Sequence, residues 1–188
     1  VGSVTVKLSD EGTYHITVGC TDMGTGCDTI IAQFAADVLE TPIDNISVYG
    51  VDTDISPYDS GSYASSTTYL TGMAAVKACE QLREHIIALA AARMNKDASA
   101  LTFDGENVID ESDGSKMSLF DIATASMCNN EISMEVTYSH SSPVSPPPFM
   151  AACAEVEVDP ETGAIELLDY TACVDCGTVV NTNLARVQ

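Results

Sequence analysis

The sequence predicts an α+β fold, in which hairpins of a mixed sheet pack against two long helices. Apolar and polar residues alternate in short runs on either side of turn residues, which is typical of hairpins. Over two longer stretches the apolar residues recur at helical spacing. Because strand-like and helix-like runs do not alternate regularly, a doubly wound parallel sheet is disfavoured.

The first half of the chain opens with a hairpin. Residues 4–8 and 14–18 alternate around Asp10-Glu11-Gly12, a turn sequence. A helix follows from Asp28 to Leu39, where apolar residues share one face until Pro42 ends the pattern.

A short strand at 46–51 precedes the strongest helical pattern of the chain, from Thr68 to Met94. At this length the second helix is expected to form a spine against the sheet.

The second half predicts more strands. Residues 101–109 form a hairpin around Asp104-Gly105-Glu106-Asn107, residues 118–127 a short helix with Ser118 as its N-cap, and residues 131–138 a strand. Two strand-like runs, 149–158 and 164–174, are joined by a turn with Pro160 and Gly163 and predict a long central hairpin.

Residues 139–148 are rich in Pro and Ser and predict an internal linker, since consecutive prolines supply no N–H groups for a sheet. We interpret residues 1–188 as a single, partial domain. The chain begins on Val1 inside a strand-like run and ends at Gln188 without a capping signal, so we expect a piece of a longer polypeptide.

The net charge of the chain disfavours two classes of binding partner. Seven Lys and Arg against 28 Asp and Glu give a net charge of −21, which repels nucleic acid and anionic membranes. A salt-adapted source or a basic partner subunit also fits this charge. No apolar run is long enough to predict a membrane span and no leader is visible, so a cytoplasmic location is expected.

Seven cysteines, an odd number lying mostly in apolar or strand-like runs, predict free and largely buried thiols. Cys173 and Cys176 form a Cys-x-x-Cys without a second pair, and the three histidines are scattered, so a zinc site is disfavoured. A thioredoxin-type motif is disfavoured too, because Cys176 closes a strand-like run.

Gly24-Thr25-Gly26 stands between a strand-like run and a helix start. Two glycines allow a sharp turn and close approach to a ligand, and the helix aims N–H groups at the gap. An ordinary strand-to-helix turn gives the same pattern. A phosphate-binding enzyme is disfavoured, because no Lys follows the turn and Asp28 would repel an anion.

Hydroxyl side chains crowd residues 60–68, directly before the long helix. Hydroxyls both donate and accept hydrogen bonds, which suits a heterocycle with mixed edges such as a pterin. A Ser/Thr-rich loop with an N-cap is the alternative interpretation.

Taken in order, these segments resemble the molybdenum hydroxylases, the xanthine dehydrogenase and aldehyde oxidase family, in the molybdopterin-binding domain of the large subunit. The resemblance covers residues 2–80 and 146–188. It is carried by Thr21-Asp22-Met23-Gly24-Thr25-Gly26, Asp52-Thr53, Pro57, 61–67, Gly72-Met73-Ala74, 146–149, 154–159, Gly163, 174–177, Val180-Asn181 and Gln188.

The resemblance implies two cofactor-binding segments. Thr25 stands where the family has a glutamine whose amide bonds the cofactor, with Gly24 and Gly26 beside it and their N–H groups available to the ligand. The second segment maps onto residues 62–67, with Ala64 near the metal. The implied cofactor-binding residues are Gly24, Thr25, Gly26, Ser62, Ala64, Ser65, Ser66 and Thr67.

The resemblance also implies a molybdenum-dependent oxidoreductase, similar to xanthine dehydrogenase, that hydroxylates a heterocycle or an aldehyde. The pterin holds the metal, so no protein ligand to the metal is expected. The catalytic base is a glutamate beyond Gln188, and the fragment alone is therefore expected to be inactive. Implied partners are FAD and 2Fe-2S modules, the rest of the large subunit and a small-molecule substrate, in an oligomer.

The pterin is expected in its cytosine dinucleotide form. The sequence does not rank purine, nicotinate and aldehyde as substrates. One alternative from another class remains, a noncatalytic acidic α+β scaffold in which both segments are only turns and caps.

Overall fold

The structure is a computed structural model that describes residues 1–128 and 132–187. The chain forms two compact units, Val1–Pro143 and Val144–Gln188. Their boundary lies inside the predicted 139–148 linker.

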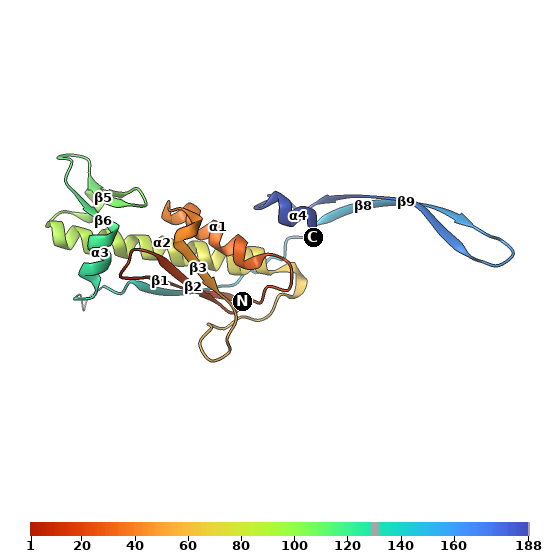
Figure 1. The fold of residues 1–188 in the computed structure, drawn as a ribbon, viewed down its shortest axis with the longest axis horizontal. Coiled ribbons are helices and arrows are strands. Elements are labelled where there is room, and N and C mark those ends of the chain that lie inside the picture. The colour runs from red at the N-terminus through yellow and green to blue at the C-terminus, as the bar shows by residue number, and fades with distance from the viewer. Residues whose placement is uncertain (129–131, 188) are drawn as a thin grey trace. The chain divides into compact units, whose positions relative to one another are not determined.

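The first unit is built on a four-stranded sheet of order β3-β2-β1-β7 (Figure 1). Its strands are β1 (Gly2–Leu8), β2 (Tyr14–Val18), β3 (Ile46–Tyr49) and β7 (Glu135–His140). β1 pairs antiparallel with β2 and β7, while β2 and β3 are parallel, so the predicted mixed sheet is confirmed. The predicted start of the last strand, Glu131, lies outside the described residues, and β7 extends to His140 inside the predicted linker.

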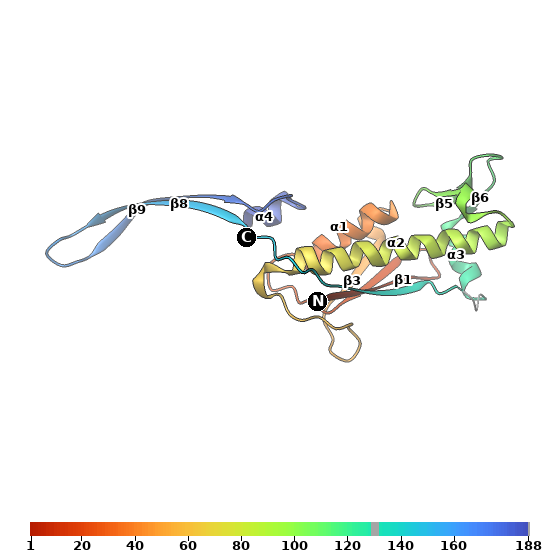
Figure 2. The ribbon, with the colours of Figure 1, turned by 180° about the vertical axis from the view of Figure 1, so that it is seen from behind.

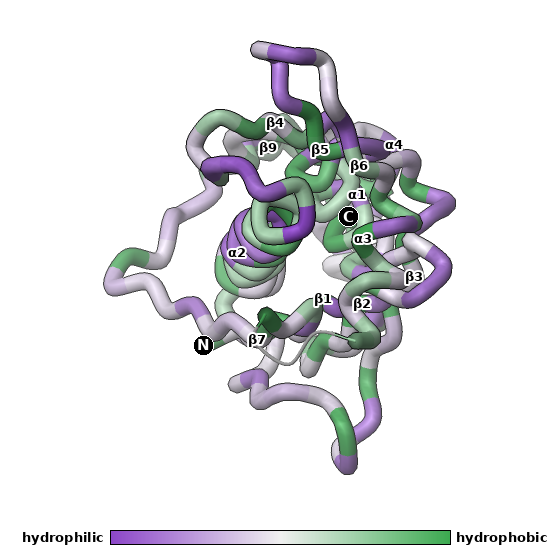
Figure 3. Tube along the Cα trace, turned by 90° about the vertical axis from the view of Figure 1, so that its left-hand side faces the viewer, coloured by the Kyte–Doolittle hydropathy of each residue, from purple (hydrophilic) through white to green (hydrophobic). Residues whose placement is uncertain are grey.

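Two helices cover one face of this sheet, α1 (Cys27–Leu39) and α2 (Thr67–Met94) (Figures 2 and 3). Both match their predicted ranges to within one residue. Helix α2 packs on β1 and β7 and also on α1, as expected of a spine. The largest side chains of the core come from both layers: Val4, Tyr14, Ile16, Ile31, Leu39, Leu82 and Ile86 are all at most 1% exposed.

A small second sheet lies near the end of α2. It contains β4 (Leu101–Phe103), β5 (Asn107–Asp110) and β6 (Lys116–Ser118), in that order, followed by helix α3 (Leu119–Ser126). The predicted hairpin and the N-cap are confirmed, since the Ser118 hydroxyl accepts a hydrogen bond from the Asp121 N–H at 3.1 Å. The described residues also form 3₁₀ turns at Ile43–Asn45, Tyr63–Ser65 and Ala98–Ala100.

The second unit is a hairpin of β8 (Phe149–Val158) and β9 (Ile165–Asp175), followed by a short helix α4 (Thr182–Val187). The predicted turn is confirmed, because the Asp159 carboxylate accepts the N–H of Glu161 at 2.8 Å. The predicted long hairpin is confirmed, since β8 and β9 pair antiparallel along their length. Every residue of both strands is exposed, and among the described residues the two strands pair only with each other.

All seven cysteines are free thiols, as predicted. Cys20, Cys27 and Cys79 are buried, but Cys128, Cys153, Cys173 and Cys176 are exposed. The prediction of burial is therefore wrong for the thiols of the hairpin, because an alternating pattern does not reveal whether a second layer covers a strand. Within the described ranges, no helix combines the length and apolar character needed to cross a membrane.

Candidate functional site

The two predicted ligand-binding segments lie at the same end of the first unit. One leads from β2 into α1 and the other precedes α2, and both views place the two helix N-termini together (Figures 1 and 2). Gly19, at the end of β2, lies tightly against the segment that leads to α2. A Cβ at Gly19 would come within 2.4 Å of the Pro57 carbonyl oxygen and 2.7 Å of the Asp59 Cβ. The residues just before the first segment therefore pack against the residues just before the second.

Asp22 shapes the Gly24-Thr25-Gly26 loop. Its Oδ1 accepts hydrogen bonds from the N–H of Gly24 at 2.8 Å and of Gly26 at 3.1 Å, and these bonds lower the pKa of Asp22. Gly24 and Gly26 have φ values of +100° and +74°, a conformation that glycine adopts without a steric penalty. Two of the three N–H groups expected to serve a ligand are thus held by the protein's own carboxylate.

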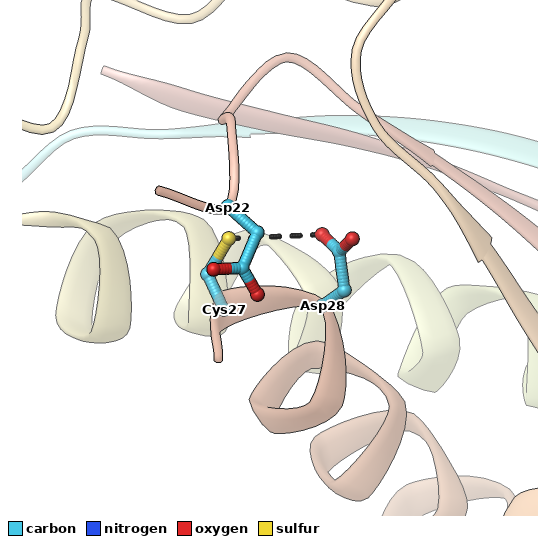
Figure 4. A group of neighbouring side chains, drawn as sticks. All are labelled: Asp22, Cys27 and Asp28. Carbon is cyan, nitrogen blue, oxygen red and sulfur yellow. Dashed lines mark hydrogen bonds between the residues drawn. The ribbon is translucent and has the colours of Figure 1, made fainter. Parts of the chain in front are cut away.

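Asp22, Cys27 and Asp28 form a cluster beside this loop (Figure 4). The Cys27 thiol donates to Asp28 Oδ1 at 3.6 Å. Burial raises the pKa of Asp28, and the charge of Asp22 adds to this shift. The contact with the buried Cys20 thiol, at 4.0 Å, and burial raise the pKa of Cys27. The start of α1 is therefore already acidic, which disfavours an anion there.

The second segment has an unusual backbone. Ala64 and Ser65 have φ values of +55° and +54°, in the left-handed region that non-glycine residues rarely adopt. Ser66 is buried, and its hydroxyl donates to the Gly61 carbonyl at 3.5 Å. Ser66 thus closes the loop from inside, while Ala64 and Ser65 are exposed at its tip.

Several hydroxyls at this end of the unit have no hydrogen-bond partner among the residues that the structure describes. Within residues 1–128 and 132–187, the side chains of Thr25, Ser62, Ser65 and Thr67 make no hydrogen bond to another described residue. Helix α2 begins at Thr67 without a side-chain cap and without an acidic residue in its first turn. Its first N–H groups and its dipole therefore favour an anion, in contrast to α1.

A surface depression of about 780 Å³ lies elsewhere, lined by residues 7–10, His15, Ser126, Met127 and 132–135. None of the predicted cofactor-binding residues lines it.

The chain belongs to the molybdopterin cofactor-binding domain family, whose model matches residues 1–188. It is 36% identical over 184 residues to "Probable hypoxanthine oxidase XdhD" of Escherichia coli K12, covering 97% of this chain and 19% of the relative. It is 26% identical over 193 residues to the xanthine dehydrogenase molybdenum-binding subunit of Escherichia coli O157:H7, covering 100% and 26%.

The fold is that of a solved structure, the reconstituted CO dehydrogenase from Oligotropha carboxidovorans. The TM-score is 0.81 at 24% identity, over 99% of this chain and 24% of that one. The α+β fold is thereby confirmed. The chain spans between about a fifth and a quarter of the length of these relatives.

The residues present fit a molybdopterin. A pterin edge has donors and acceptors, which the uncommitted hydroxyls of Thr25, Ser62 and Ser65 can match. A phosphate on the same ligand suits the uncapped start of α2. Sequence reasoning missed the roles of Asp22 and Asp59 in shaping the loops. An aspartate two residues before a glycine signals such a turn and stands before both segments.

Proposed function

We propose that this chain forms part of the molybdopterin pocket in the large subunit of a molybdenum-dependent oxidoreductase similar to xanthine dehydrogenase. The parent enzyme hydroxylates a heterocycle or an aldehyde. When bound, the cofactor supplies the redox chemistry of its molybdenum, and the protein supplies binding and orientation.

One observation carries this proposal: two loops from distant parts of the sequence lie at one end of the unit, with hydroxyls left uncommitted. Residues 62–67 bind the larger share of the ligand, because this loop offers Ser62, Ser65 and Thr67 beside an uncapped helix. Ser66 acts through the shape of the loop, and Ala64 leaves room for the metal.

The Gly24-Thr25-Gly26 loop contributes less of its backbone than an open glycine turn would. Asp22 already accepts the N–H groups of Gly24 and Gly26, and the Thr25 N–H also acts on this carboxylate, so Thr25 supplies the contact through its hydroxyl. Gly24 has open space beside it, since a Cβ there would meet nothing within 4 Å. We assign that space to the ligand.

The rest of the large subunit provides the catalytic base, a glutamate, and completes the pocket. Partner modules hold FAD and 2Fe-2S centres, and the assembly is an oligomer in the cytoplasm. The relative named as a molybdenum-binding subunit supports a divided enzyme of this kind. The pterin is the cytosine dinucleotide form.

Molybdenum and pterin analysis of the purified full-length parent tests the proposal. The wild-type enzyme contains both, and Gly24→Ala and Ser65→Ala each lower the molybdenum content. Gly114→Ala is the matched control for Gly24, because Gly114 also has a positive φ and open space beside it. Ser47→Ala, on the exposed side of β3, is the control for Ser65.

The results separate the enzyme from the scaffold. An active, purified parent that contains neither molybdenum nor pterin refutes the proposal. Unchanged molybdenum content in both loop variants, with only lower stability, favours the acidic scaffold.

A further inference from the structure

Asp59 accepts hydrogen bonds from both ends of the loop that follows it. Its Oδ1 accepts the N–H of Gly61 at 2.8 Å, and its Oδ2 accepts the hydroxyl of Thr71 at 3.1 Å. Gly61 begins the loop, and Thr71 stands one turn inside α2. One carboxylate thus ties together the two ends of residues 61–71.

The surroundings of Asp59 limit its movement. Asp59 is half-buried, and Thr71 is only 1% exposed. The backbone of Gly19 lies so close to Asp59 that a Cβ there would come within 2.7 Å of the Asp59 Cβ. The segment is also bonded to the residue that precedes β1, because Ser60 donates its N–H to the Val1 carbonyl at 3.1 Å.

The tip of the loop needs such support. Ala64 and Ser65 both hold a left-handed backbone, which persists only where the surrounding contacts fix it. Neither side chain is buried, and the Ser65 hydroxyl has no partner among the described residues. The conformation of the tip therefore depends on the ends of the loop, which Asp59 and Ser66 hold.

We infer that Asp59 is a positioning residue for the cofactor segment 62–67. It does not contact the ligand itself. By holding Gly61 and Thr71, it keeps the Ser62 and Ser65 hydroxyls in the arrangement that binds molybdopterin. This inference rests on the proposed function and adds to it a residue outside the binding segments.

The test uses the full-length parent enzyme and measures molybdenum per polypeptide after dilution and dialysis, together with the thermal unfolding midpoint. Asp59→Ala lowers cofactor affinity on the order of tenfold, as loss of a supporting hydrogen-bond partner does at metal sites. Asp59→Asn restores part of the affinity, because its amide oxygen accepts from Gly61 and its NH₂ donates to Thr71.

Thr71 gives an independent variant with a milder change. Thr71→Val removes only the contact to Oδ2 and lowers molybdenum retention less than Asp59→Ala does, while Thr71→Ser keeps the hydroxyl and the retention. The control is Asp104→Ala. Asp104, like Asp59, accepts two hydrogen bonds, here from the N–H groups of Glu106 and Asn107, but it lies in the β4–β5 turn.

A positioning role requires cofactor loss beyond any loss of stability. The inference is overturned if the Asp59→Ala and Asp104→Ala variants retain the same amount of molybdenum. It is also overturned if the Asp59→Asn variant retains no more molybdenum than the Asp59→Ala variant. Should Asp59→Ala fail to fold, the Thr71 pair decides: equal retention in Thr71→Val and Thr71→Ser overturns the inference.

Different results refute the proposed function and the role of Asp59. Wild-type enzyme without molybdenum refutes the function. Only the role of Asp59 is refuted if the wild-type enzyme contains molybdenum and the Gly24→Ala variant loses it, while the Asp59→Ala and Thr71→Val variants keep it.

Discussion

The ring of Phe34 in α1 lies directly against the backbone of Gly72 in α2, where a Cβ would come within 2.6 Å of the ring. The absence of a side chain at Gly72 thus lets the two helices approach closely. Both candidate loops lead into these helices, so their spacing sets the separation of the loops.

Replacing Gly72 with Val is expected to lower the free energy of unfolding by about 1–3 kcal/mol, because the added methyl groups overlap the Phe34 ring. Urea unfolding of the chain measures the loss. Phe34→Ala in the same chain makes room, so the double variant loses less than the sum of the two single variants. Strict additivity contradicts the proposed contact.

The acid stability of the small second sheet depends on Lys96. Its ammonium group pairs with Asp110 Oδ2 at 2.9 Å and also with Asp113. The Ser112 hydroxyl and Lys96 lower the pKa of Asp110, and Lys96 above all lowers the pKa of Asp113, from an ordinary value of 3.8. This stabilisation is present above pH 3.8 and is lost as the pH falls through the lower native pKa values.

Lys96→Met is therefore expected to flatten the loss of stability on the acid side of pH 3.8, measured by urea unfolding at a series of pH values. Lys116→Met, which removes a charge from β6, serves as the control and keeps the wild-type slope. Identical slopes in the Lys96 variant and the wild type would show that the pairs do not act in solution.

Local sequence patterns predicted most of the helices and strands, but they did not predict which distant strands pair. The β1–β2 hairpin follows from alternation around Gly12, and α2 from apolar spacing that ends at Met94. The pairing of β1 with β7 had no local signal, because the two strands are joined by most of the unit. Strand β6 is three residues long, which is too short to show an alternation of apolar and polar residues.

The candidate site was predictable in part. Glycine and hydroxyl patterns located both loops, but not the carboxylates that hold them. Gly24 and Gly26 donate their N–H groups to Asp22, whereas the sequence predicted that these groups would bind the ligand. A sequence does not show which of two acceptors, protein or cofactor, takes a given N–H.

Thr25→Gln in the full-length parent is expected to slow the loss of molybdenum on dialysis. The longer amide reaches farther than the hydroxyl and both donates and accepts. Thr25 is exposed, so the larger side chain meets no packing barrier. Metal content over time is the measurement, with Thr25→Ala expected to lose molybdenum faster than the wild type. Retention that is the same in all three proteins would mean that position 25 does not contact the cofactor.

The cysteines are expected to react with a thiol reagent in two groups. Cys128, Cys153, Cys173 and Cys176 react quickly in the native chain because they are exposed. Cys20, Cys27 and Cys79 react slowly, and burial raises the pKa of Cys79 to about 12, which leaves little thiolate. Peptide mass spectrometry after timed alkylation identifies each site, and rapid labelling of Cys79 would contradict the buried core.

The pairing of β1 with β7 has a consequence during synthesis. Val6 faces Val136, about 130 residues later in the chain. At the usual pace of translation the ribosome needs roughly 6 to 26 s to make that stretch. Until then the edge of β1 that pairs with β7 is open, and an open strand edge can pair with another chain.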